Sequence, residues 1–413
     1  MTTVLPEAGR TDVIERIRTL RVPRFANIVW VEVTTADGAV GTGEACLGAL
    51  AIDDYIHETA APYLLGRHAS DIERHDRALR GYVGYDGAGV ETRGNGAVNL
   101  ALWDLAGRVT GRPVYELLGG RSRDRIRAYN TCAGYAYALS GGQLALADSG
   151  LHAISAAGPY EDLEAAIHRP AELARDLLAQ GIGAMKIWPF DSAATASHGR
   201  SIDAAAIERA IEPIRAIREE LGDRMDIMVE LHAQWQPEPM RAIVAALEEY
   251  RPLWLEDPIK ATSPADLAAL ARSTPLAIAI SETVAGRQRF KELLDAGALD
   301  VLIFDVGWTG GITEARKLAS LAEVYEVPVA PHDCTGPLLL AASAQLSIHL
   351  PNAMIQEHVR AITSGWYAEG VVDLPEVRDG FMSAPTGPGL GSRLRDEVWT
   401  RPDAVIRISG TAA

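Results

Sequence analysis

Short apolar runs that each end in a polar residue recur between residues 184 and 357 of the chain. The runs are AMK, DIMVE, PLWLE, LAIAISE, LDVLIFD, VPVAPH and AMIQE, and most precede an alanine-rich amphipathic stretch such as AIERAIEPIRAIREEL. After a first interval of 44 residues, their polar ends are 26, 26, 23, 27 and 25 residues apart. One strand, one helix and two loops take about that length, so the pattern predicts a parallel sheet. Seven or eight such units predict a closed (β/α)8-type barrel.

The N-terminal part of the chain follows a different pattern. Residues 11–46 are strand-like, and Asp37-Gly38 lies between two runs as a hairpin turn signal. Residues 53–118 have apolar positions at helical spacing and stop at Gly119-Gly120. We therefore expect an α+β domain at residues 1–125, the barrel at 126–358, and a C-terminal segment at 359–413 that packs back on the first domain.

The composition narrows the class of protein. With 413 residues, 48% of them hydrophobic, the chain is long enough for a barrel and a further domain. Its net charge of −16 argues against nucleic acid or an anionic membrane as the main partner. Three scattered cysteines suit a reducing compartment, and we find no uninterrupted apolar span of about 20 residues. We expect a soluble, cytoplasmic protein.

The polar ends of the seven runs are all ionisable residues. In a barrel of this type the carboxyl ends of the strands converge on one mouth, where active sites are found. Unpaired carboxylates that meet there would repel one another and raise one another's pKa. The seven residues are Lys186, Glu230, Glu256, Glu282, Asp305, His332 and Glu357.

Three glutamates on consecutive strand ends indicate a cation site. Hard oxygen ligands without cysteine favour Mg²⁺, with Mn²⁺ as a possible substitute. The alternative is that Glu230, Glu256 and Glu282 pair with Lys or Arg. The ends of those three strands offer no basic residue, so we expect the metal.

The remaining polar ends suggest acid–base chemistry. A carboxylate beside an imidazole fixes its tautomer and raises its basicity, so Asp305 and His332 are expected to act as a general base. Lys186 could neutralise a substrate carboxylate, and Glu357 could donate a hydrogen bond to an oxyanion if neighbouring acids keep it protonated. A divalent metal, a base and further acids suit abstraction of the proton α to a carboxylate.

Several motifs resemble the enolase superfamily, mandelate racemase subgroup. They are LALWDLAGRVTGRPVYELLGG, VELH, PLWLEDPI, ISE, FDVGWTGGITEARKLASLAEVYEVPVAPH and NAMIQEH. The resemblance implies a modified TIM barrel with an α+β capping domain, and homo-oligomers. It also implies that Glu230, Glu256 and Glu282 bind Mg²⁺, that His332 with Asp305 is the base, that Glu357 hydrogen-bonds the enediolate, and that Lys186 is the first lysine of a Lys-x-Lys motif.

Two positions direct the prediction within this family. Trp188 stands where the second lysine of that motif would be, so a two-base racemase is not expected. His232 follows the first metal ligand by two residues, as in sugar-acid dehydratases of the galactonate and mannonate type, where such a histidine protonates the departing 3-hydroxyl. The alternative is that His232 is only a polar residue of the rim.

We therefore predict a dehydratase that converts an aldonate or aldarate, a small-molecule carboxylate, to a 2-keto-3-deoxy acid. The alternatives are a one-base cycloisomerase or epimerase of the same superfamily, or a non-catalytic ligand-binding homologue. Residues 45–55 and 81–90 are expected to close over the mouth, and residues 138–162 to form a long surface loop.

Overall fold

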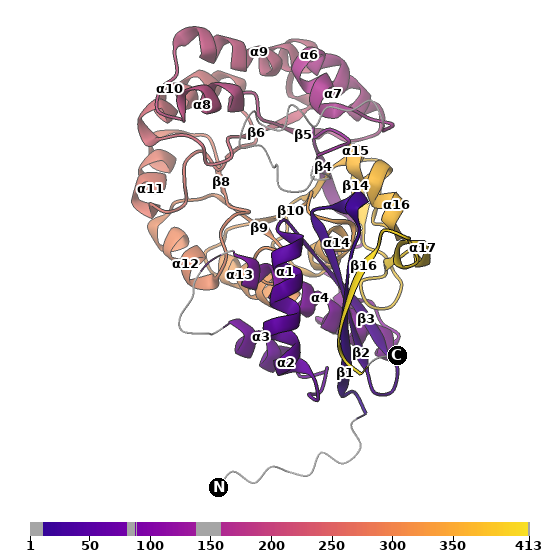
Figure 1. Ribbon diagram of the computed structural model, residues 1–413. Helices are drawn as coiled ribbons and strands as arrows, with labels where there is room; N and C mark the ends of the chain where they lie inside the picture. The colour runs from indigo at the N-terminus through magenta and orange to yellow at the C-terminus, as the bar shows by residue number, and fades with distance from the viewer. Residues whose placement is uncertain (1–10, 81–86, 88, 138–157, 412–413) are drawn as a thin grey trace.

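A four-stranded antiparallel sheet joins the two ends of the chain (Figure 1). Its strands, in spatial order, are β16 (Val405–Gly410), β1 (Ile14–Arg21), β2 (Ile28–Thr35) and β3 (Val40–Cys46). The computed structural model describes residues 11–80, 87, 89–137 and 158–411. Gly38, with φ of 85°, lies between β2 and β3 at the hairpin turn that the sequence predicted. The sheet and the helices that follow it form the cap.

Most of the helices that follow β3 in the cap pack against this sheet. The helices of the cap are α1 (Ala49–Tyr55), a π-helix (Ile56–Ala60), α2 (Ala61–Leu64), α3 (Ile72–Arg80), α4 (Val90–Thr110) and α5 (Val114–Leu117). Helix α4 lies directly against β3, because Gly41 and Gly43 have no side chain there. A Cβ atom at these positions would lie 2.1 Å and 1.9 Å from the carbonyl oxygens of Ala101 and Ala97. This close packing builds the hydrophobic core of the cap.

Eight parallel strands form the barrel. They are β4 (Ile126–Thr131), β5 (Ala184–Ile187), β6 (Asp226–Glu230), β7 (Trp254–Glu256), β8 (Ile278–Ile280), β9 (Val301–Asp305), β10 (Val329–His332) and β11 (Gln356–His358). Strand β11 pairs with β4, and a parallel bridge between Val329 and Ala353 connects β10 to the segment before β11, which closes the ring. The predicted barrel with a cap is confirmed. The seven apolar runs are β5 to β11, and the eighth strand, β4, ends in the uncharged Thr131.

Helices surround the barrel and follow most of its strands (Figure 1). They are α6 (Asp162–His168), α7 (Pro170–Ala179), α8 (Asp191–Ser197), α9 (Ala204–Leu221), α10 (Pro237–Leu247), α11 (Pro264–Ser273), α12 (Arg287–Ala296), α13 (Ile312–Val324) and α14 (Pro337–His349). Inward-facing side chains such as Tyr129, Met228 and Trp254 fill the barrel below its mouth. That packed interior leaves polar side chains at the carboxyl ends of the strands.

The C-terminal segment runs from the barrel back to the cap sheet. Its elements are α15 (Arg360–Ile362), a π-helix (Thr363–Tyr367), α16 (Ala368–Gly370), β12 (Val371–Val372), β13 (Glu376–Arg378), β14 (Phe381–Ser383), β15 (Arg393–Leu394) and α17 (Asp396–Trp399), followed by β16. Most of residues 81–90, and residues 138–157 of the expected surface loop, lie outside the described residues. Within the described part of the chain, no helix has the length and apolar character needed to cross a membrane.

Candidate active site

The three predicted metal ligands meet at the mouth of the barrel. Glu230 and Glu256 end neighbouring strands in register, and Glu282 follows β8 by two residues. One carboxylate oxygen from each residue lies within 4.8 Å of the others. Glu230 and Glu256 are buried, and the Glu282 side chain is 12% exposed. Parallel strand ends therefore bring three distant acids together.

The oxygen atoms of this cluster suit a divalent cation. Oε2 of Glu230 and Oε2 of Glu282 are buried and accept no hydrogen bond. Burial, and then the charge of Glu230, raises the pKa of Glu256 to about 8. Burial and the same cluster raise the pKa of Asp257 well above its ordinary value. A hard cation such as Mg²⁺ would bind these oxygens, which accept no hydrogen bond, and relieve this repulsion.

Lys186 is closer to the glutamates than the sequence suggested. Its Nζ lies 2.6 Å from Oε1 of Glu256, 3.1 Å from Oε1 of Glu357 and 3.5 Å from Oε2 of Glu230. The expectation that the glutamates have no basic partner was therefore wrong. The lysine side chain reaches them across the narrow mouth, although β5 is not adjacent to β7. One ammonium group does not balance the charge of the three predicted metal ligands and Glu357. A divalent cation therefore still suits the cluster.

Asp305 and His332 form a buried pair on adjacent strands. The two residues are opposite each other in the register of β9 and β10, and His332 Nδ1 lies 2.8 Å from Oδ2 of Asp305. Asp305 also accepts hydrogen bonds from the amides of Gly307 and Trp308 and from Oγ1 of Thr335. The carboxylate is thus fixed, and Nε2 of His332 is left to face the mouth.

The surroundings of Nε2 are acidic. It lies 3.7 Å from Oε2 of Glu282 and 3.5 Å from Sγ of Cys334. Burial favours the neutral imidazole, but nearby groups, Glu282 first among them, hold the pKa of His332 well above its ordinary value. A cation held by Glu282 would oppose that charge and favour the neutral form that a base requires.

The surroundings of Glu357 disfavour the protonated form on which its predicted role depends. Burial would raise its pKa, but Lys186 and His332 hold the pKa of Glu357 below its ordinary value. Its carboxylate accepts hydrogen bonds from Oγ1 of Thr131 and from the amide of Asp333. Glu357 therefore accepts hydrogen bonds in this structure and pairs with Lys186.

His232 has a carboxylate partner that the sequence reasoning missed. Its Nδ1 lies 2.6 Å from Oδ2 of Asp191, the first residue of α8. Burial disfavours the imidazolium, but Asp191 and then Glu230 raise the pKa of His232 to about 10. The ring also makes an edge contact with Trp188, at 5.8 Å between centroids. At neutral pH the imidazole therefore carries a proton that it can donate.

The local backbone explains why Glu230 and His232 lie close together. Strand β6 ends at Glu230, and His232 adopts a left-handed conformation with φ of 48°. Because the strand ends at Glu230, the two side chains are not related by the alternating directions of side chains along a strand. Oε1 of Glu230 accepts hydrogen bonds from the amides of Leu231 and His232, which holds the strained turn against the strand end.

Several supporting residues do not lie at the ends of strands, so the pattern of polar strand ends could not identify them. Asp191 and Thr335 lie in loops or helix starts after strands, and nothing in a single sequence connects them with a histidine elsewhere. Asp257 directly follows a predicted ligand in PLWLEDPI. That second buried acid was a signal available in the sequence, and Oγ of Ser281 now satisfies one of its oxygens at 2.8 Å.

Comparisons with known proteins agree with this architecture. Residues 19–119 match the family model described as mandelate racemase / muconate lactonizing enzyme, N-terminal domain. Residues 169–398 match the model described as enolase C-terminal domain-like. Together these matches include the cap helices and seven of the eight barrel strands.

Proteins of known name align over most of the chain. D-galactonate dehydratase of Variovorax paradoxus is 30% identical, over 93% of this chain and 92% of its own length. D-xylonate dehydratase of Haloferax volcanii is 29% identical, over 94% of this chain and 89% of its own. A crystal structure of an Agrobacterium tumefaciens enolase of the mandelate racemase subgroup is 41% identical, with a TM-score of 0.85, covering 96% of this chain and 99% of its own. The chain therefore belongs to the enolase superfamily, in its mandelate racemase subgroup.

Proposed function

We propose that this protein is a Mg²⁺-dependent dehydratase of a sugar acid, an aldonate or aldarate. The observation that carries the proposal is the pairing of two histidines with carboxylates on opposite walls of the mouth. His332 ends β10, and His232 follows β6, which is four strands away in a ring of eight. Relatives named D-galactonate and D-xylonate dehydratase support the same reaction class.

The metal site and Lys186 would hold the substrate carboxylate. Glu230, Glu256 and Glu282 would bind Mg²⁺, which when present supplies Lewis-acid stabilisation of charge that develops on the carboxylate. Glu357 and Glu256 hold the ammonium group of Lys186 at the mouth. There it would pair with the same substrate carboxylate. A preorganised charge of this kind lowers the cost of forming an enediolate from a weak carbon acid.

The two histidines would move the protons. His332, oriented by Asp305, would take the C2 proton on Nε2. The electron pair of the C2–H bond then forms the C2–C3 double bond as the C3–O bond breaks, and His232 gives its proton to the leaving hydroxyl, which departs as water. The resulting enol tautomerises to the 2-keto-3-deoxy acid. Trp188 contacts His232 where a second lysine base would otherwise stand.

A screen of aldonates and aldarates with purified protein and Mg²⁺ tests the proposal. Formation of a 2-keto acid, measured as its semicarbazone, supports dehydration. Exchange of the α-proton in D₂O without a keto product would instead favour the epimerase or cycloisomerase. Absence of both keto product and exchange over the whole library would favour a non-catalytic homologue.

A further inference from the structure

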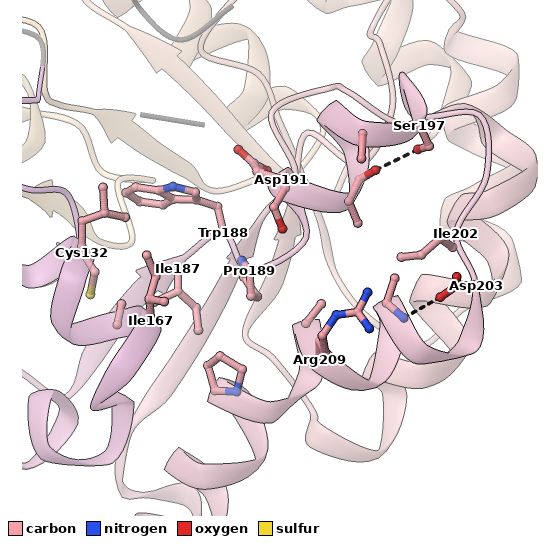
Figure 2. Close-up of a pocket in the computed structure, with 18 of the residues that line it drawn as sticks. Cys132, Ile167, Ile187, Trp188, Pro189, Asp191, Ser197, Ile202, Asp203 and Arg209 are labelled. Carbon is pink, nitrogen blue, oxygen red and sulfur yellow. Dashed lines mark hydrogen bonds between the residues drawn. The ribbon is translucent and has the colours of Figure 1, made fainter. Parts of the chain in front are cut away.

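A cavity of about 660 Å³ lies beside the part of the mouth where Asp191 pairs with His232, the proposed proton donor. It lies outside the metal cluster. It is bounded by the segment after β5, by α6, and by helices α8 and α9 (Figure 2). Trp188 and Asp191 belong to its wall, and neither the glutamates nor His332 does. The volume is typical of a site for a small organic molecule, and the proposed dehydration does not use it.

One side of the cavity is apolar. Ile167, Ile187, Ala210 and Pro213 lie along it. The side chain of Ile167 is 40% exposed although its residue type is normally buried. This apolar side offers no hydrogen-bond partners for the hydroxyl groups of a sugar acid, and the hydroxyl groups of the lining come from Ser192, Ser197 and Ser201.

The other side contains Arg209, an exposed residue of α9 whose side chain has no partner among the described residues. The guanidinium group of Arg209 lies between the labelled residues Pro189 and Asp203 in Figure 2. Two other arginines of α9 are engaged: Arg215 pairs with glutamates of its own helix, and Arg218 donates to backbone carbonyls. Arg209 makes neither an ion pair nor a side-chain hydrogen bond in the described structure.

The nearest acid in the wall is already in use. Asp203 caps the N-terminus of α9, and its Oδ1 accepts a hydrogen bond from the amide of Ala206 at 2.7 Å, drawn as a dashed line in Figure 2. The wall therefore presents an exposed, unpaired guanidinium group beside an apolar surface.

From this combination we infer a second ligand site, which binds a carboxylic acid with an apolar body of about four to eight carbon atoms. The carboxylate would pair with the fork of Arg209, which matches its geometry. The hydrocarbon body would lie against Ile167 and Ile187 and remove them from water. The ligand would lie behind Trp188, the side chain that contacts His232.

Isothermal titration calorimetry with hexanoate tests the inference on the full chain. Titrations in EDTA keep the probe from the metal centre, and hexanamide and gluconate serve as neutral and polyhydroxy comparison ligands. We expect hexanoate to bind, and hexanamide and gluconate to bind at least about tenfold more weakly. Arg209→Gln should weaken hexanoate binding by about the same factor. Arg241→Gln should not, because Arg241 is likewise exposed but lies on α10, outside the cavity lining.

Three results would overturn the inference. One is the absence of heat from about 10 mM hexanoate at two well-separated temperatures, because apolar burial changes the heat capacity and cannot be silent at both. Another is equal affinity of wild type and Arg209→Gln. The third is loss of binding in Lys186→Met, which would place the probe in the barrel mouth. Ile167→Trp is designed to fill the cavity and so to prevent hexanoate from binding. Circular dichroism checks that this variant folds.

Discussion

The two histidine–carboxylate pairs at the mouth are built in different ways. His332 and Asp305 sit in register on adjacent strands, and the His332 side chain is only 4% exposed. His232 follows its strand in a left-handed turn, its side chain is 28% exposed, and its partner Asp191 begins a helix after another strand. One pair is therefore part of the sheet, whereas the other joins a turn to the first residue of a helix beyond the strand ends.

The difference extends to the carboxylates. Asp305 accepts three further hydrogen bonds from Gly307, Trp308 and Thr335, so its orientation is fixed. Asp191 accepts one more, from Nε2 of Gln234 at 3.2 Å, and its Oδ1 is buried without a partner. A rigid pair suits the demanding removal of a proton from carbon. A pair outside the sheet can protonate a leaving hydroxyl, which needs only a charged imidazole within reach.

Removal of His332, the proposed base, should have the largest effect on activity. His332→Asn deletes the proposed base, so we expect turnover and α-proton exchange in D₂O both to fall by at least about 10⁴-fold. Proton exchange by nuclear magnetic resonance and keto-acid formation measure the two steps separately. Residual exchange close to the wild-type rate would assign the base to another residue.

Removal of the acid should separate the two steps. In His232→Asn we expect dehydration to fall by about 10²- to 10⁴-fold while exchange of the α-proton stays measurable, because the base is intact. The same two assays apply. Dehydration at the full rate would show that His232 is only a polar residue of the rim.

Loss of the partner of His232 should have a smaller effect than loss of the histidine. Asp191→Asn removes the charge that favours the imidazolium, so we expect kcat for dehydration to fall by about tenfold to a hundredfold. Exchange should again persist. Gln234→Ala is a matched control, because it removes the other side chain bonded to Oδ2 of Asp191 and leaves the charge pair in place. An equal loss in both variants would point to a general disturbance of the loop.

The comparison also explains what the sequence could predict. Glu230, Glu256, Asp305 and His332 end regular strands, and the carboxyl ends of parallel strands must converge, so a periodic pattern was enough to find them. Glu282 was found in the same way although it lies two residues beyond its strand. The barrel and its cap followed from the same regularity and from the family motifs.

The features that were missed depend on how side chains fill the mouth. Asp191 becomes the partner of His232 only through the turn after β6, which no strand pattern describes. Lys186 reaches glutamates from β6, β7 and β11, and that requires a closed, narrow ring. The lowered pKa of Glu357 reflects the nearby charges of Lys186 and His332, and a linear sequence does not show that these groups meet.

The smallest expected effect concerns Glu44, a residue of the cap that contacts the barrel near His332. Glu44 of β3 is fully buried, and its Oε1 accepts hydrogen bonds from the amides of Leu338 and Leu339 at the start of α14, just after the strand of His332. Burial raises the pKa of Glu44 from 4.5 to about 8, in spite of these donors and the indole of Trp30. Near neutral pH the folded chain therefore holds a proton that the unfolded chain releases.

That difference fixes the sign of a pH effect. The stabilising contribution of protonated Glu44 is complete below the unfolded pKa of 4.5 and is lost as pH rises towards about 8. The free energy of unfolding should therefore decrease over this window, by at most about 1.4 kcal/mol per pH unit. Glu44→Gln keeps an acceptor but cannot ionise, so urea unfolding at several pH values should show a flatter dependence than in wild type. Glu219→Gln, an exposed glutamate on α9, should retain the wild-type slope. A Glu44→Gln protein with the unchanged slope would mean that Glu44 is already ionised at pH 5, held by its three donors at the junction between cap and barrel.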